Sequence, residues 1–180
     1  MENSVKNSLA VKPIYIQLGF LLLAFLALYY PFIQTLVRDW DTNDNYSQGY
    51  FIPFVSAFMI WWMRDELAAI ELKPSTWGIA LIVLGLLQLF IAKVGSEYFL
   101  QRTSMIVVLF GISFFLFGRR WTRAIWLPLV YLIFMIPLPA IVWNRIAFPM
   151  QLFASALTED VVQLLGIPIL REGNVLHHSM

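Results

Sequence analysis

One uninterrupted apolar run near the amino terminus constrains this chain more than any other feature. The run IYIQLGFLLLAFLALYYPFIQTLV covers Ile14 to Val37. A helix rises about 1.5 Å per residue, so the run reaches roughly 36 Å and can cross a hydrocarbon core of about 30 Å. It is also longer than the apolar core of a cleaved signal peptide, which has about 7 to 15 residues. We therefore expect a retained transmembrane helix over residues 14–37.

Four shorter apolar runs follow and predict further spans. In the first, Pro53 fits the first turn of a helix, and Trp61 and Trp62 suit an interfacial belt, which favours a short span over a re-entrant segment. Glycines interrupt the next two runs, as closely packed membrane helices tolerate. Pro137 and Pro139 end the last run, because a helix usually stops before a proline. The expected spans are residues 50–63, 77–92, 103–117 and 124–136.

The composition predicts an all-α, polytopic membrane protein with about five transmembrane helices. The chain is 60% hydrophobic and 13% charged, with a mean hydropathy of +0.74, whereas a soluble domain is about half apolar and a quarter charged. Its net charge of +1 is too small and too dispersed to indicate nucleic-acid binding. We expect the lipid bilayer as a partner and no nucleic acid. Without a visible repeat or soluble domain, residues 1–180 are expected to form a single transmembrane domain.

The distribution of basic residues predicts the orientation. If the amino terminus is inside, the inner segments hold seven Lys and Arg and the outer segments hold five. The tight cluster GRRWTR, residues 118–123, then lies inside, where short loops of membrane proteins are enriched in Lys and Arg. This predicts a cytoplasmic amino terminus and places everything after Pro137 on the outer face.

The stretch PMQLFASALTEDVVQLLG predicts an amphipathic helix over residues 147–166. Its polar residues recur every four positions and draw one stripe along the helix: Gln151, Ser155, Glu159 and Gln163. Such a helix either lies in the membrane interface with its stripe in water, or crosses as a sixth helix with its stripe facing a protein interior. The adjacent charges of Glu159 and Asp160 favour the interfacial position on the outer face.

Standard catalytic and cofactor motifs are missing from the chain. There is no P-loop, no HExxH, no GxSxG and no acidic residue in the middle of an apolar run. We therefore expect no cofactor. The loop RDWDTNDNYSQGY brings Asp39, Asp41 and Asp44 near Tyr46 and Gly49, and such carboxylates can bind a divalent cation. A solvated turn is the commoner role for such a loop.

The carboxyl-terminal stretch LREGNVLHHSM offers two further candidates. His177 and His178 have imidazoles suited to metal binding, but adjacent residues rarely ligate one ion, so a frayed tail is expected and no metal site is predicted. The other candidate is a turn that is either a plain surface turn, which the pattern favours, or a device that orients a neighbouring segment. Its residues are Arg171, Glu172, Gly173 and Asn174.

Three stretches together resemble the exosortase family of membrane-embedded, transpeptidase-like cysteine proteases. They are NYSQGYFIPFVSAFMIWW, WLPLVYLIFMIPLPAIVWNRIAFPMQLFASAL and LLGIPILREGNV, in the family's order and spacing. The family's first stretch typically begins Asp-Tyr-Ser-His-Gly, whereas Asn45 and Gln48 stand at its first and fourth places here. A role that needs a carboxylate or an imidazole is therefore not expected at these two positions. The residues that match the family's motifs are Tyr46, Ser47, Gly49, Pro137, Pro139, Arg171, Glu172, Gly173 and Asn174.

This resemblance implies a nucleophile outside the 180 residues. In exosortases the loop similar to REGNV leads to a catalytic Cys in an Ala-Cys-Ser-Gly setting, and a catalytic Arg and His follow with further spans. The present chain contains no Cys, and neither Arg171 nor His177 matches those catalytic motifs. The expectation is an amino-terminal portion that ends before its nucleophile, has no catalytic residue of its own, and is inactive alone.

The resemblance also implies substrates and a location. The substrates are secreted proteins with a carboxyl-terminal Pro-Glu-Pro sorting signal, known as PEP-CTERM proteins. The location is the inner membrane of Gram-negative bacteria that make exopolysaccharide. A different class, a non-enzymatic subunit of a polysaccharide export assembly, is the alternative. The missing nucleophile supports it, and the lack of a terminating helix or polar cap after the last loop speaks against it. A transporter fragment is disfavoured because no ionisable residue marks a path through the middle of a span.

Overall fold

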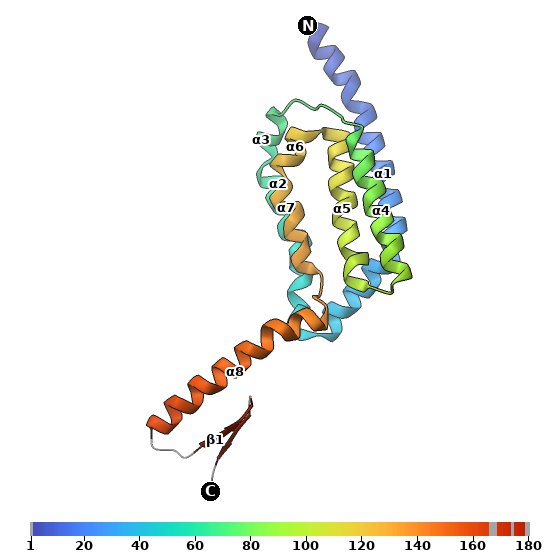
Figure 1. Ribbon diagram of the computed structural model, residues 1–180. Coiled ribbons are helices and arrows are strands. Elements are labelled where there is room, and N and C mark those ends of the chain that lie inside the picture. Colours follow the sequence, from blue (N-terminus) through green and yellow to red (C-terminus); the bar gives the residue numbers. More distant parts are fainter. Residues whose placement is uncertain (1, 166–168, 174, 179–180) are drawn as a thin grey trace. The chain divides into compact units, whose positions relative to one another are not determined.

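The computed structural model describes residues 2–165, 169–173 and 175–178, and its described part is helical except for one short hairpin (Figure 1). The chain divides into two compact units, Met1–Pro137 and Leu138–Met180. Every long element in both units is a helix, and several are apolar along their whole length. The predicted all-α, polytopic membrane architecture is confirmed.

The first unit contains nine helical elements. In chain order they are α1 (Glu2–Thr42), η1 (Asp44–Tyr50), α2 (Phe51–Trp62), α3 (Arg64–Ala69), α4 (Trp77–Val94), α5 (Tyr98–Phe117), α6 (Arg119–Ala124), α7 (Trp126–Tyr131) and η2 (Leu132–Met135). The second unit contains α8 (Ala140–Leu164) and the strands β1 (Ile169–Glu172) and β2 (Val175–His178).

Three of these helices are long and apolar enough to cross a membrane: Ile16–Thr42 within α1, α4 and α5. They coincide with the expected spans 14–37, 77–92 and 103–117. A fourth span results if Trp126–Met135 and Ala140–Leu164 are counted together as one broken span. The expected spans 50–63 and 124–136 fall on shorter helices, α2 with α3 and α6 with α7 and η2, so the number five stays a prediction.

Helices α4 and α5 form the closest pair in the first unit, and their glycines allow it. A Cβ built on Gly111 of α5 would lie 2.7 Å from the backbone nitrogen of Ile82 in α4. A Cβ on Gly85 of α4 would lie 2.6 Å from a methyl group of Val108 in α5. Small residues at such crossings let membrane helices gain van der Waals contact that larger side chains would prevent.

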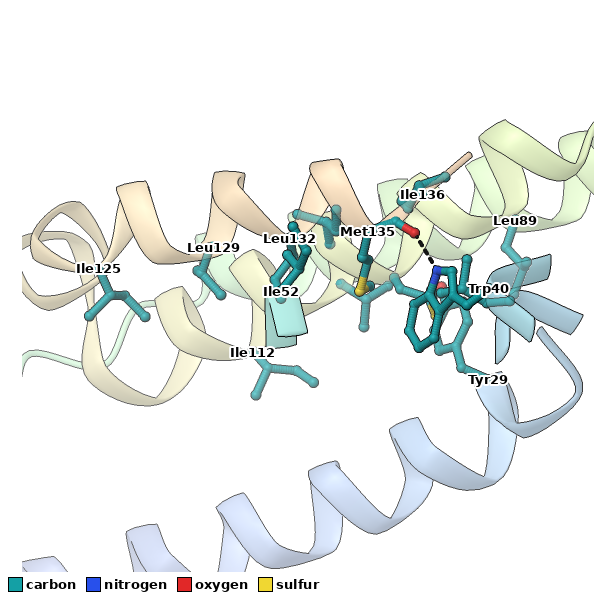
Figure 2. Packing of buried hydrophobic residues seen from close by; sticks show 14 of the residues in the cluster. Tyr29, Trp40, Ile52, Leu89, Ile112, Ile125, Leu129, Leu132, Met135 and Ile136 are labelled. Carbon is teal, nitrogen blue, oxygen red and sulfur yellow. Dashed lines mark hydrogen bonds between the residues drawn. The ribbon is translucent and has the colours of Figure 1, made fainter. Parts of the chain in front are cut away.

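A buried cluster fills the space between α1, α2, α5 and α7 (Figure 2). Tyr29 of α1 is fully buried, and its hydroxyl shares a hydrogen bond of 3.0 Å with Ser104 of α5. Ser56 of α2 donates to the carbonyl of Pro128 in α7 over 2.8 Å. These bonds satisfy polar groups inside a region that water does not reach, so the packing does not leave them unpaired.

Candidate functional site

Two regions carry the residues that the sequence singled out, one in each unit. In the first unit, Tyr46, Ser47 and Gly49 lie in η1, the short helix that follows α1. The Asn43 side chain accepts a hydrogen bond from the Asn45 backbone over 3.1 Å and caps this helix. The exposed Ser47 hydroxyl donates to the Asp44 carbonyl over 3.0 Å, so it serves the local turn. The stretch expected as an open loop is therefore mostly helical.

Gly49 occupies a position where no side chain fits. Its buried backbone lies against the indole of Trp40, and a Cβ on Gly49 would overlap the indole ring. The Trp40 indole N–H donates to the Met135 carbonyl over 2.8 Å, as Figure 2 shows. Tyr50 packs edge-on against the same indole, with ring centroids 4.9 Å apart. The lack of a side chain at Gly49 thus leaves room for the Trp40 indole, which connects the end of α1 to the end of η2.

This contact joins two stretches that lie far apart in the sequence. Met135 is the last residue of η2, and Ile136 after it is extended, so the helix stops before Pro137 as predicted. Pro139 then precedes the first turn of α8. The Trp40 hydrogen bond therefore fixes the segment that leads into the Pro137-Leu138-Pro139 stretch against the end of α1.

The acidic residues of this region have separate partners. Asp39 forms an ion pair of 2.6 Å with Arg102, whose side chain is buried at the start of α5. Asp41 accepts a hydrogen bond of 2.6 Å from the Tyr50 hydroxyl, and this bond raises the pKa of Tyr50, which lies outside the three long spans. Within the described residues, no group of three or more His, Asp and Glu side chains could hold a metal ion.

In the second unit, the polar stripe of α8 faces the hairpin. The Ser155 hydroxyl donates to the Leu152 carbonyl of its own helix over 3.0 Å and shares this proton with the Gly173 carbonyl at 3.3 Å. The Gln163 side chain donates to the Ile169 carbonyl over 3.3 Å. Between them, Arg171 pairs with Glu159 through its Nε over 3.0 Å. These three bonds are spaced four residues apart on the helix. The stripe predicted to face water or a protein interior is therefore covered by the chain's own hairpin over this length.

The hairpin is built around the turn that the sequence predicted. Strands β1 and β2 are antiparallel, with Arg171 opposite Leu176 and Glu172 opposite Val175. Gly173 has a φ of 66°, a left-handed conformation that a two-residue hairpin turn requires and that glycine adopts without steric cost. The Arg171 Nη1 also donates to the Gly173 carbonyl over 3.2 Å, so one guanidinium braces both the helix and the turn.

The ion pair is partly shielded from water. The side chains of Arg171 and Glu159 are 31% and 22% exposed. The second carboxylate oxygen of Glu159 accepts from the Gln163 amide over 3.4 Å, so both oxygens are engaged. We expect such a pair to define the position of the hairpin more strongly than a fully exposed one would.

The remaining candidates fall at the edge of the described region. Glu172 lies in β1 and its backbone is paired, while its side chain and all of Asn174 lie outside the described residues. His177 and His178 lie in β2 opposite Leu170 and Ile169, so their backbone forms a strand where a frayed tail was expected. Their side chains lie outside the described part as well.

Sequence reasoning missed Trp40 and Arg102, the two side chains that organise the first region. Trp40 was read only as part of an acidic loop, although a tryptophan between two aspartates just after a span is an unusual placement. Arg102 was counted as a charge of an outer loop, and the structure buries it with Asp39. The same buried guanidinium has one nitrogen, Nε, without a hydrogen-bond partner among the described residues.

The two regions are suited to holding chain segments in place. The sequence contains no Cys, and the hydroxyls of Ser47 and Ser155 are bonded to backbone carbonyls. The bonds described above join α1 to η2 in one unit and α8 to β1 in the other. The side chains of these two regions can hold the backbone of a neighbouring segment against a helix.

Comparison with known proteins gives one result. A family model described as transmembrane exosortase (Exosortase_EpsH) matches residues 40–179. The match begins at Trp40 and includes both regions described above. No curated protein and no solved structure matches the chain.

Proposed function

Because the chain belongs to the transmembrane exosortase family, we propose that it is the membrane scaffold of a cysteine protease or transpeptidase that processes PEP-CTERM sorting signals of secreted proteins. In this role the 180 residues hold the segment that leads to the nucleophile and are inactive alone. A thiolate activated by a nearby His would attack the carbonyl carbon of a peptide bond. The C–N bond would break, the amine would leave with a proton from that His, and an acyl-enzyme would remain. The chain has no Cys to supply that thiolate.

One observation carries the scaffold role: α8 holds the hairpin through three side-chain bonds along one stripe. By resemblance, the loop containing Arg171 and Gly173 precedes the catalytic Cys of an exosortase. A nucleophile must be held within a fraction of an ångström of its productive position, and supporting residues supply that precision. A hairpin fixed to a long helix is well suited to this task.

We further propose an inner-membrane location with a cytoplasmic amino terminus. Basic residues gather at the end of the first unit where α3 meets α4 and α5 meets α6: Arg64, Lys73, Arg119, Arg120 and Arg123. At the opposite end, Arg102 is paired with Asp39, and the other basic residues are Arg38 and Lys93. The positive-inside rule favours the first end as cytoplasmic.

The test is co-expression with a secreted protein that carries a Pro-Glu-Pro sorting signal, in cells that lack other exosortases. The chain alone is expected to leave this substrate uncleaved. Together with the missing carboxyl-terminal half of a close relative, it is expected to restore processing, because the halves of a multi-span protein can insert separately and then assemble. Restoration should vanish when the relative's catalytic Cys is replaced by Ala.

Two outcomes would contradict the proposal. One is processing by the 180-residue chain alone, and the other is no processing although both halves insert and co-purify. The alternative function, a non-enzymatic subunit of a polysaccharide export assembly, draws on the same lack of Cys. The codons after Met180, or the intact mass of the natural product, distinguish the two: an open frame that continues into Ala-Cys-Ser-Gly supports the exosortase function, and a stop supports the subunit.

A further inference from the structure

Helix α8 carries a second stripe, which is apolar and exposed. Its members are large side chains between 49% and 87% exposed, at intervals of three or four residues: Ile146, Met150, Phe153, Leu157, Val161 and Leu164. On an ideal helix of about 3.6 residues per turn, this stripe is centred about 180° from the polar stripe that holds the hairpin. From Met150 onward, α8 therefore has the hairpin along one side and an apolar ridge along the other. In its first turns, Ile141 and Phe148 are also exposed on the side of the polar stripe.

The size of these residues indicates lipid as the partner of the ridge. Helices that pack together inside a membrane favour small residues at the contact, as the glycines between α4 and α5 illustrate. The exposed side chains of the α8 ridge are Phe, Leu, Ile, Val and Met, and Ala154 lies at the edge of the ridge. Long flexible apolar side chains suit acyl chains, which adapt to an uneven surface.

The hairpin limits how deeply α8 can enter the lipid. A two-stranded sheet has two edges whose backbone N–H and C=O groups need water or another partner, and such edges are not tolerated in hydrocarbon. The hairpin is bonded to α8 from Ser155 to Gln163, so this length cannot be surrounded by acyl chains. The partly exposed pair of Arg171 and Glu159 adds a further cost to immersion.

We infer that α8 lies along the bilayer–water interface, with its apolar ridge in the acyl chains and the hairpin on the aqueous side. The start of the helix fits this arrangement. Trp143 is 44% exposed, and an amphipathic indole is typical of the headgroup level. Arg145 follows two residues later and is exposed, so its long side chain can reach lipid phosphates. The bilayer surface would thus set the height of the hairpin.

The experiment uses the lack of Cys in the whole chain. Nitroxide labels are attached to the single variants Ile146→Cys, Phe153→Cys and Val161→Cys on the ridge, in the complete chain reconstituted into phosphatidylethanolamine–phosphatidylglycerol bilayers. Thr158→Cys is the matched control, because Thr158 is exposed and lies about 100° around the helix from the centre of the ridge. Collision rates with oxygen, which enriches in lipid, and with a water-soluble nickel chelate give the depth of each label.

An interfacial helix places all three ridge labels at a similar depth, about 5–10 Å into the headgroup and acyl boundary. Their ratio of oxygen to nickel collisions should exceed that of the Thr158 label several-fold. A helix that crosses the bilayer would instead separate the Ile146 and Val161 labels by up to about 22 Å in depth. Such a gradient would overturn the inference.

Two further results would also overturn it. Low collision rates with both reagents at the ridge would mean that protein covers it, and high nickel rates there would mean that it faces water. Each labelled variant must unfold at the temperature of the parent chain, and Leu157→Cys replaces any that does not. The readout involves no peptide processing, so it stands apart from the test of the proposed function.

Discussion

The ion pair between Glu159 and Arg171 offers the sharpest test of the hairpin's attachment. We consider Glu159→Gln and Arg171→Gln, singly and together, since both changes remove a charge and keep a polar side chain. Gln has the shape of Glu but is shorter than Arg. A hydrogen bond to a charged group contributes about 1.5–3 kcal/mol when buried. The two side chains are 31% and 22% exposed, so solvent screening lowers the expected value to about 1 kcal/mol.

Amide hydrogen exchange of β1 and β2 measures this contribution directly. If the hairpin opens locally, weakening its attachment by about 1 kcal/mol should raise the exchange rate of its backbone amides about fivefold. The amides of α4 and α5 should be unaffected, because they lie in the other unit. The double variant should exchange about as fast as Arg171→Gln alone, since that change already removes both the ion pair and the Arg171 bond to the Gly173 carbonyl.

Asp160→Asn is the control for this experiment. It removes one negative charge from the neighbouring residue, which is exposed and has no bond to the hairpin among the described contacts. Its hairpin amides should exchange at the parent rate. The reasoning would be refuted if Glu159→Gln left exchange unchanged, or if Asp160→Asn raised it equally, since a general charge effect would then explain the result.

Two other predictions concern the first unit. Gly49→Ala should lower the free energy of unfolding by about 1–3 kcal/mol, because the added methyl group overlaps the Trp40 indole, and Tm should drop by several degrees. Gly19→Ala is the control: no atom lies within 4 Å of its added Cβ, so Tm should stay unchanged or rise. Equal effects of the two substitutions on Tm would exclude a steric cause. In intact cells, an impermeant maleimide should label Asn43→Cys and should label Ser75→Cys only after permeabilisation. The reverse pattern would invert the proposed orientation.

The apolar spans could be read from the sequence because their cause is local. A run of apolar residues long enough to cross the bilayer must satisfy its backbone within itself, and in one segment only a helix does so. Hence residues 14–37, 77–92 and 103–117 were placed without knowledge of any contact. The stop before Pro137 was predictable for the same reason, since a proline restricts the residue that precedes it.

The four-residue recurrence predicted an amphipathic helix over residues 147–166, and α8 runs over Ala140–Leu164, so the recurrence located this helix but not its start. It left open what the polar stripe would face. Water, a protein interior and a hairpin all accept the same donors and acceptors. The pairing of Glu159 with Arg171 depends on the chain turning back after the helix, and no pattern within the helix contains that information.

The first region shows the same contrast between features that the sequence predicts and contacts that only the fold creates. A glycine at position 49 and a tryptophan at position 40 are visible in the sequence, but the indole's partner is the carbonyl of Met135, 95 residues away. Likewise, the sequence shows a positive charge at Arg102, but the burial of this side chain beside Asp39 follows from how α1 and α5 pack. Hydrophobicity and helical periodicity act between neighbours and were determined by the sequence alone. Pairings between distant residues depend on where the whole chain brings each side chain, and only the tertiary structure decided them.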